Sequence, residues 1–397
     1  MSNWQELEHR YFMPTFMRLP ITLVRGRGAI VWDEDGQGYL DFVAGWAVNS
    51  LGHCHPAVVG AVTEQVKTLI QVSNSFYTIP QIQLAELLVK NSCLDKVFFC
   101  NSGAEAAEGA VKLARRYGKL HLGGAYEVIT ASGSFHGRTL AMVSASAQSK
   151  FQHPYIPLPE GFINVDYNSI EAIKAATTSK VCAVMLEPVQ GEGGVNLPDN
   201  NYLTAVRDWC DEMGILLILD EVQTGVARTG TLFAYQQYGI EPDIMTLGKG
   251  LASGIPIGVV MAKDKFSVFT PGEHGSTFGG NPVTCAAGYA TLKFIIDHDI
   301  ADSVKRVGQY LTDGLKRLDQ KFKFITEIRG LGLLLAMEFS HDIAQQVMMT
   351  CLDDGLLVNT LSPNALRFMP PLNIGNYEVD EALSILDKAL LGITSEI

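Results

Sequence analysis

Positive charge, paired cysteines and long apolar runs are all scarce in this sequence. Its 397 residues include 30 lysines and arginines against 42 aspartates and glutamates, which gives a formal net charge of −12. This balance argues against nucleic acid and against anionic membrane surfaces as partners. The seven cysteines are scattered, odd in number and without paired spacing. We therefore expect reduced thiols and a cytoplasmic location.

No apolar run approaches the length needed to cross a membrane, and residues 1–10 carry no apolar signal segment. A soluble protein is therefore expected. The sequence also shows no low-complexity stretch and no internal repeat. What is present is a chain that is 47% apolar and 18% charged, long enough for one large core and a smaller unit.

Short apolar strands alternate with amphipathic helices between residues 50 and 295, an order typical of an α/β protein with a mostly parallel sheet flanked by helices. A hairpin is predicted before this region, with residues 29–32 and 39–42 joined around Asp35-Gly36. Helices near 301–318, 341–354 and 377–393 interleave with strands after it and indicate a small α+β domain. We expect an N-terminal segment over 1–48, a large domain over 49–295 and a small domain over 296–397.

A lysine and an aspartate stand at the ends of two buried strands. Lys249 lies in Thr246-Leu-Gly-Lys-Gly250, just past the strand-like run Ile244–Leu247, and Asp220 ends the run Leu216–Asp220. Ligands gather at the carboxyl ends of strands in such sheets. Pyridoxal phosphate needs an amine to form a Schiff base with its aldehyde and a carboxylate to keep its pyridine nitrogen protonated. Taken singly, either residue could be an ordinary surface charge.

The run Asn101-Ser-Gly-Ala-Glu-Ala106 follows an apolar strand and opens a helix that we expect to reach about Tyr117. Ser102 with Glu105 is typical of a capping box, and Gly103 lets the backbone approach a ligand closely. Free N–H groups at a helix start suit a phosphate. Taken alone, the motif could be a helix cap and nothing more.

The run Ser134-Phe-His-Gly-Arg-Thr139 combines an aromatic ring with an arginine. Phe135 can stack on a flat pyridine ring, and Arg138 offers a planar fork for a carboxylate. Phe135 could equally be core, and Arg138 a surface cation. His136 between them is interpreted as a packed, hydrogen-bonded histidine rather than a general base.

Two carboxylates lie on the glycine-rich run Leu186-Glu-Pro-Val-Gln-Gly-Glu-Gly-Gly194, and an arginine lies in the apolar run Leu366–Leu372. A buried arginine needs a partner, so Glu187 or Glu192 is a candidate for Arg367. The alternatives are solvated loop acids and an edge-strand arginine.

Together these runs resemble the class III, or subgroup II, pyridoxal-phosphate aminotransferases, and most closely the acetylornithine and ornithine aminotransferases. The resemblance covers nearly the whole chain and includes residues 19–28, Gly52-His-Cys-His-Pro56, Asp220-Glu-Val-Gln-Thr-Gly225 and His274-Gly-Ser-Thr-Phe-Gly-Gly-Asn-Pro282. It implies the fold type I architecture of pyridoxal-phosphate-dependent transferases. It also implies a homodimer with shared active sites, in which the N-terminal hairpin joins the C-terminal domain.

The resemblance also implies a role for each motif residue. Lys249 would be the Schiff-base lysine and Asp220 the partner of the pyridinium. The remaining cofactor contacts would be Ser102, Gly103 and Ala104 for the phosphate, Phe135 and Val222 for the ring faces, Gln223 for the phenolic oxygen, and Thr277 for the phosphate of a neighbouring subunit. Substrate would lie near Ser276, Arg138, Glu187, Glu192 and Arg367.

The implied reaction moves the terminal amino group of an ω-amino acid, N-acetylornithine first among them, to 2-oxoglutarate, which yields glutamate and belongs to arginine biosynthesis. Arg138 would bind one carboxylate of each partner and Arg367 the second carboxylate of glutamate, with Glu192 covering Arg367 when no second carboxylate is present. Two departures concern the donor. Trp46 stands where acetylornithine aminotransferases commonly have isoleucine, and Phe16 where a tyrosine often binds substrate. Ornithine, succinylornithine and 4-aminobutyrate stay open as donors.

A metal-dependent hydrolase is the alternative from another class, because His53, Cys54 and His55 carry atom types that zinc accepts. Pro56 opens a predicted helix with apolar Val59, Val62, Val66 and Leu69, however, which leaves the histidines in its entry loop. We therefore expect no metal. Decarboxylase or aminomutase chemistry also stays possible, because the cofactor stabilises several kinds of carbanion.

Overall fold

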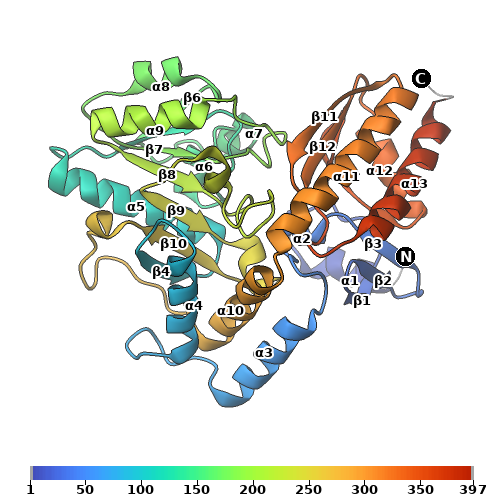
Figure 1. The fold of residues 1–397 in the computed structure, drawn as a ribbon, viewed down its shortest axis with the longest axis horizontal. Helices are drawn as coiled ribbons and strands as arrows, with labels where there is room; N and C mark the ends of the chain where they lie inside the picture. Colours follow the sequence, from blue (N-terminus) through green and yellow to red (C-terminus); the bar gives the residue numbers. More distant parts are fainter. Residues whose placement is uncertain (1–2, 395–397) are drawn as a thin grey trace.

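A seven-stranded sheet forms the centre of the larger lobe in the computed structural model, which describes residues 3–394 (Figure 1). Its strand order is β4-β10-β9-β8-β7-β5-β6. The strands are β4 (Lys96–Cys100), β5 (Glu127–Ala131), β6 (Phe162–Val165), β7 (Val181–Leu186), β8 (Leu216–Asp220), β9 (Ile244–Leu247) and β10 (Gly258–Ala262). Only β10 runs antiparallel to its two neighbours; the other pairings are parallel. The predicted α/β class with a mostly parallel sheet is confirmed.

Burial explains why these segments are strands. Every residue of β7, β8 and β9 is buried, as expected for continuous apolar runs covered by helices on both faces. The larger helices of this lobe are α3 (Pro56–Thr68), α4 (Ile79–Lys90), α5 (Gly103–His121), α8 (Ile170–Ala176), α9 (Tyr202–Met213) and α10 (Pro282–Asp297). Short α-helical turns are α2 (Ala44–Ala47), α6 (Leu140–Ala145) and α7 (Ser149–Gln152), and short 3₁₀ turns are η1 (His153–Tyr155), η2 (Ala234–Tyr238), η3 (Lys249–Ala252) and η4 (Asp264–Phe266).

The smaller lobe combines both ends of the chain. Its C-terminal part consists of α11 (Ile300–Lys321), α12 (Ala344–Asp353), α13 (Asn376–Ile393) and the sheet β11-β12-β15-β14, with β11 (Ile325–Leu331), β12 (Leu334–Phe339), β14 (Asn359–Ser362) and β15 (Ala365–Phe368). The N-terminal part contributes α1 (Asn3–Tyr11), β1 (Leu23–Arg27), β2 (Ile30–Asp33) and β3 (Gly38–Asp41). The predicted hairpin is confirmed by the antiparallel pairing of β2 with β3. The short strand β13 (Leu356–Leu357) pairs with β3, so the two ends of the chain share a sheet.

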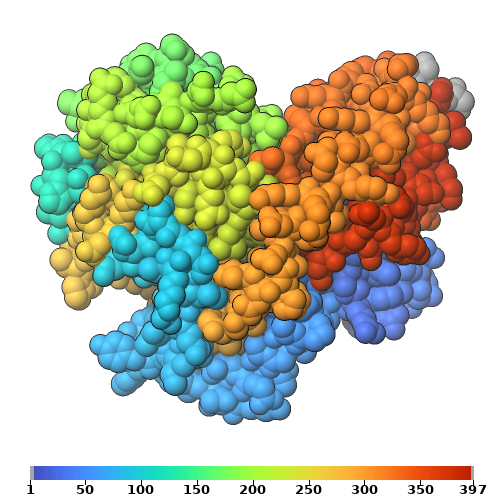
Figure 2. Space-filling view, viewed as in Figure 1, coloured from blue at the N-terminus to red at the C-terminus, as the bar shows by residue number. Residues whose placement is uncertain are grey.

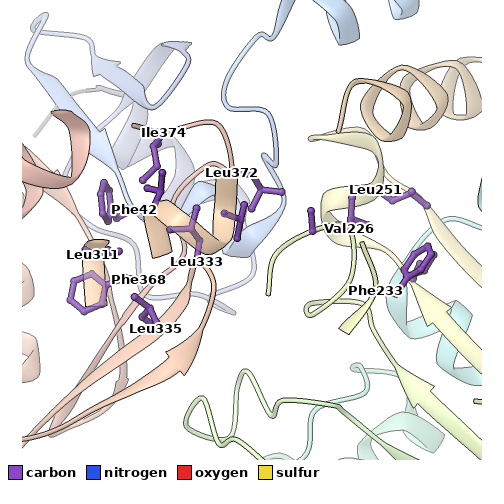
Figure 3. Close-up of a cluster of buried hydrophobic side chains, with 14 of the residues drawn as sticks. Phe42, Val226, Phe233, Leu251, Leu311, Leu333, Leu335, Phe368, Leu372 and Ile374 are labelled. Atoms are coloured by element: carbon purple, nitrogen blue, oxygen red, sulfur yellow. The ribbon is translucent and has the colours of Figure 1, made fainter. Parts of the chain in front are cut away.

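The two lobes share one hydrophobic core although their outline is notched between them (Figure 2). Figure 3 shows side chains of this cluster from both lobes, Phe233 and Leu251 from the larger and Phe368 and Leu335 from the smaller. The proposed boundaries at 48/49 and 295/296 stay a prediction; the second would fall in the last turn of α10.

The predicted helix that opens at Pro56 is confirmed as α3, and several of its apolar side chains are exposed. In α3, Val59 is 47% and Val66 is 42% exposed, and Leu69 just beyond the helix is 39% exposed. Within residues 3–394, every helix is too short or too polar to cross a membrane. All seven cysteines are free thiols, as expected.

Candidate active site

Strand register brings the lysine and the aspartate to one edge of the central sheet. Asp220, the last residue of β8, lies opposite Thr246 of β9. Lys249 follows two residues after β9 ends, with a left-handed φ of 37°. Both side chains line one cavity of about 260 Å³.

The same cavity collects residues from four further segments. Its walls are formed by Gly103, Ala104, Phe135, His136, Gly137, Arg138, Glu187, Glu192, Asp220, Val222, Gln223, Thr224 and Lys249. The cavity therefore brings together predicted residues from the start of α5, from the run Ser134–Thr139, from the loop after β7 and from the ends of β8 and β9. It does not include Ser102, Ser276, Thr277, Trp46, Phe16 or Arg367.

The start of α5 forms a concave backbone surface. Ser102 caps the helix by accepting a hydrogen bond from the Glu105 backbone N–H at 3.2 Å, as predicted. Glu105 reaches back to the backbone N–H of Asn101 instead of that of Ser102. A Cβ on Gly103 would lie 2.6 Å from Val222 Cγ1, so glycine is required for this approach. The first turn of a helix leaves N–H groups without intrahelical acceptors, and these suit a phosphate.

Asp220 is held by three neighbours. Its Oδ1 accepts from the Thr246 hydroxyl at 2.9 Å and from the Val222 N–H at 3.1 Å, and its Oδ2 lies 2.7 Å from His136 Nδ1. His136 is thus packed and hydrogen-bonded, as interpreted from the sequence. Burial, the largest single effect, disfavours the cation of His136, but the hydrogen bond to Asp220 and the negative charges of Asp220 and Glu187 together raise the pKa of His136. No local signal identified His136 or Thr246 as partners of Asp220.

Arg367 on β15 pairs with Glu192, which decides between the two candidate acids. Its fully buried guanidinium donates from Nη1 to Glu192 Oε1 at 2.7 Å and to the Gly191 carbonyl at 3.0 Å. Although burial opposes ionisation, Arg367 and Lys249 lower the pKa of Glu192. Arg367 Nη2 is buried and has no acceptor among the described residues.

Glu187 has a different environment. Its Oε2 accepts from the Phe135 backbone N–H at 3.0 Å, and burial raises its pKa to about 7. Burial also lowers the pKa of Lys249, against the opposing effect of Glu192, Glu187 and Asp220. A lowered lysine pKa increases the fraction of free amine near neutral pH.

The remaining predicted substrate residues, and Thr277 of the predicted phosphate contacts, lie outside the cavity. Trp46 is half exposed, and its ring centre lies 5.4 Å from the Arg367 guanidinium carbon. Ser276 accepts from the Asn101 side chain at 3.1 Å, while Thr277 is exposed. Phe16 is 74% exposed on the N-terminal segment, and its ring contacts Arg18. Their roles stay predictions.

The donor set fits pyridoxal phosphate. An amine, a carboxylate, an aromatic face and a helix start surround one cavity, and two buried polar atoms there, His136 Nε2 and Gln223 Oε1, have no partner in the described part of the chain. Gln223 Oε1 is therefore free to accept from a ring hydroxyl.

The histidines of the loop Gly52–Pro56 make structural hydrogen bonds. His53 Nε2 lies 2.8 Å from Asp41 Oδ2, and His55 Nδ1 accepts from the Ala57 N–H at the start of α3. A larger cavity of about 630 Å³ borders this loop, but its lining contains Arg25 and Arg27 and no carboxylate. Across residues 3–394, no group of three metal-ligating side chains converges.

Known proteins resemble the chain over nearly its full length. The family model for class-III aminotransferases matches residues 12–390. The acetylornithine aminotransferase of Caldanaerobacter subterraneus subsp. tengcongensis is 51% identical over 384 residues, which are 96% of this chain and 98% of that protein. The ornithine aminotransferase structure from Toxoplasma gondii ME49 superposes with a TM-score of 0.96 at 35% identity, covering 99% of this chain and 96% of the other. The N-acetylornithine aminotransferase structure from Stenotrophomonas maltophilia K279a gives a TM-score of 0.85 at 38% identity, with coverages of 99% and 100%.

Proposed function

Because the chain belongs to the class-III aminotransferases, we propose that it moves the terminal amino group of N-acetylornithine to 2-oxoglutarate. The chain is a pyridoxal-phosphate-dependent transaminase, as this family is. The choice of N-acetylornithine is supported by the relatives named acetylornithine aminotransferase. A pair of arginines with opposite environments supports the pairing of a monocarboxylate donor with a dicarboxylate acceptor. Arg367 is masked by Glu192, whereas Arg138 has no carboxylate partner among the described residues.

The cofactor, when bound, supplies an aldehyde that condenses with amines and a ring that withdraws electrons from the reacting carbon. Lys249 would hold the aldehyde carbon, and Asp220 would keep a proton on the ring nitrogen. The other contacts would be Ser102, Gly103 and Ala104 to the phosphate, Phe135 and Val222 to the ring faces, Gln223 to the ring oxygen, and Thr277 to the phosphate of a second subunit.

Lys249 also moves a proton in this proposal. With the cofactor bound, the Lys249 amine would carry a proton between the substrate carbon that bears the nitrogen and the aldehyde carbon of the cofactor. A general base works best when it is deprotonated near the working pH. The lowered pKa of Lys249 in this buried setting supports that role.

Arg138 and Arg367 would divide the carboxylates between them. N-acetylornithine presents its one carboxylate to Arg138 and its distant amine to the cofactor. Glutamate and 2-oxoglutarate present one carboxylate to Arg138 and the other to Arg367, whose unpartnered Nη2 is available for it. Glu192 neutralises Arg367 while the monocarboxylate donor is bound, which avoids an unpaired buried cation.

A homodimer would cover the exposed apolar side chains. They lie on and beyond α3 and beside the loop that carries Thr277, and they include Val59, Val66, Leu69, Ile70, Phe76, Tyr77, Ile79, Ile82 and Phe278. Patches of this kind mark protein contacts. The free thiols support a cytoplasmic location.

A donor panel tests the substrate assignment. N-acetylornithine, ornithine, succinylornithine and 4-aminobutyrate would each be assayed with 2-oxoglutarate for glutamate formation, with a Lys249→Ala preparation as the blank. We expect the highest kcat/KM for N-acetylornithine. A higher value for ornithine, in line with the structural likeness to ornithine aminotransferase, would reassign the donor.

A further inference from the structure

Phe151 lies directly against the arginine that we assign to the substrate carboxylate. The guanidinium carbon of Arg138 is 3.8 Å from the centre of the Phe151 ring and 5.4 Å from that of Phe135. Within residues 3–394, Arg138 has no carboxylate or carbonyl acceptor, so these ring contacts are what orient its fork.

The ring itself is held in place by its neighbours in α7. Gln152 donates from Nε2 to the carbonyls of Val143 at 3.2 Å and Ser144 at 3.1 Å. Gln148, the N-cap of α7, donates from Nε2 to the carbonyl of Ser134 at 2.9 Å, next to Phe135. Gln148 thus ties the turn to the segment that carries Phe135 and Arg138, and Gln152 ties it to α6. The backbone on both sides of Phe151 is therefore anchored, and its ring is a fixed platform.

A guanidinium stacked on an aromatic face uses its flat side for the contact and leaves the N–H groups at its edge free. A salt bridge would instead consume those donors and neutralise the charge. The Phe151 contact therefore holds Arg138 without competing with a carboxylate ligand. An ordered fork loses less conformational entropy when the ligand binds.

We propose that Phe151 is a positioning residue for substrate, which stacks on Arg138 and holds its N–H edge ready for the carboxylate that both amino donor and 2-oxoglutarate present. This inference rests on the proposed function, because it takes Arg138 as the shared carboxylate site. It predicts comparable effects on both half-reactions, whereas Arg367→Ala should weaken mainly glutamate and 2-oxoglutarate.

The test compares Phe151→Leu, which keeps apolar bulk but removes the π face, with Phe151→Tyr, which keeps the face. Half-saturation concentrations and limiting rates would be measured in single-turnover experiments for N-acetylornithine and for 2-oxoglutarate. With Leu, we expect half-saturation to rise about 2- to 30-fold for both ligands, the range that a cation–π contact supports. The limiting rates should change less than the half-saturation values, and Phe151→Tyr should stay near wild type.

Two further variants separate the possible failures. Lys150→Ala removes a second cation that lies 4.8 Å from the same ring, and it should leave both ligands unaffected. If Lys150→Ala weakens binding as much as Phe151→Leu does, the loss comes from disturbed α7 packing and the inference is overturned. Equal losses in Phe151→Leu and Phe151→Tyr would lead to the same conclusion. Unchanged binding in Phe151→Leu, with a large loss in Arg138→Ala, would overturn it while sparing the proposed function. Unchanged binding in Arg138→Ala would refute the carboxylate site and the inference together.

Discussion

Replacing Arg367 by alanine should separate the two half-reactions. The side chain is fully buried and donates to Glu192 at 2.7 Å, to the Gly191 carbonyl at 3.0 Å and to the Asn359 side chain at 3.3 Å. Its Nη2, which carries two further N–H donors, has no partner in the described structure. We expect a second carboxylate to accept from it and to displace Glu192.

The size of the effect follows from this burial. Losing one partner of a buried charge-assisted pair typically costs ~2–5 kcal/mol, which corresponds to roughly 30- to several-thousand-fold in affinity. We expect the upper half of this range for glutamate and 2-oxoglutarate, because Glu192 would remain as an unpaired acid beside their second carboxylate. N-acetylornithine places its one carboxylate on Arg138, so its loss should stay below about tenfold.

Single-turnover absorbance measurements can follow each half-reaction through the aldehyde and amine forms of the cofactor. A Lys321→Ala variant is a control, since it removes an ion pair with Asp387 in the same lobe on the exposed surface. Glu192→Gln should have the opposite signature: with Arg367 unmasked, preference should move toward dicarboxylates. Equal losses in both half-reactions for Arg367→Ala, or an unaltered preference in Glu192→Gln, would refute the gating role and leave the aminotransferase assignment intact.

Three further predictions concern single residues. Borohydride reduction should attach the cofactor covalently to the wild-type chain but not to Lys249→Ala, and mass spectrometry showing retained attachment would refute the lysine's role. Asp220→Asn should lower kcat by on the order of 10²-fold or more with the thermal midpoint nearly unchanged, because an unprotonated pyridine is a poor electron sink; substantial turnover would contradict this. The native pKa of Glu187 is raised to about 7 from an ordinary value of 4.5, so the folded state holds a proton that the unfolded chain releases, and stability is lost as the pH rises through this window. The free energy of unfolding of Glu187→Gln minus that of the wild type should therefore increase from pH 5 to pH 8, by at most about 3 kcal/mol. Urea titrations measure this difference, and a value independent of pH would exclude the raised pKa of Glu187.

The sequence by itself determined the elements and the chemistry they carry. The runs that form β7, β8 and β9 are short, apolar and uninterrupted. Ser102 is predicted as a helix cap from local sequence alone, because Glu105 follows three residues later. Helix starts, turns and strand ends depend on residues a few positions apart. Lys249 and Asp220 could be singled out because each lies at the end of such a strand.

Pairings between distant segments were decided only by the tertiary structure. Sequence left Glu187 and Glu192 as equal candidates for Arg367, and the choice depended on how β15 lies against the loop after β7. The partners of Asp220 and the contact of Phe151 with Arg138 had no local signal either. Strand register and the packing of short turns set these distances, and both result from the burial of the whole core, to which every element contributes.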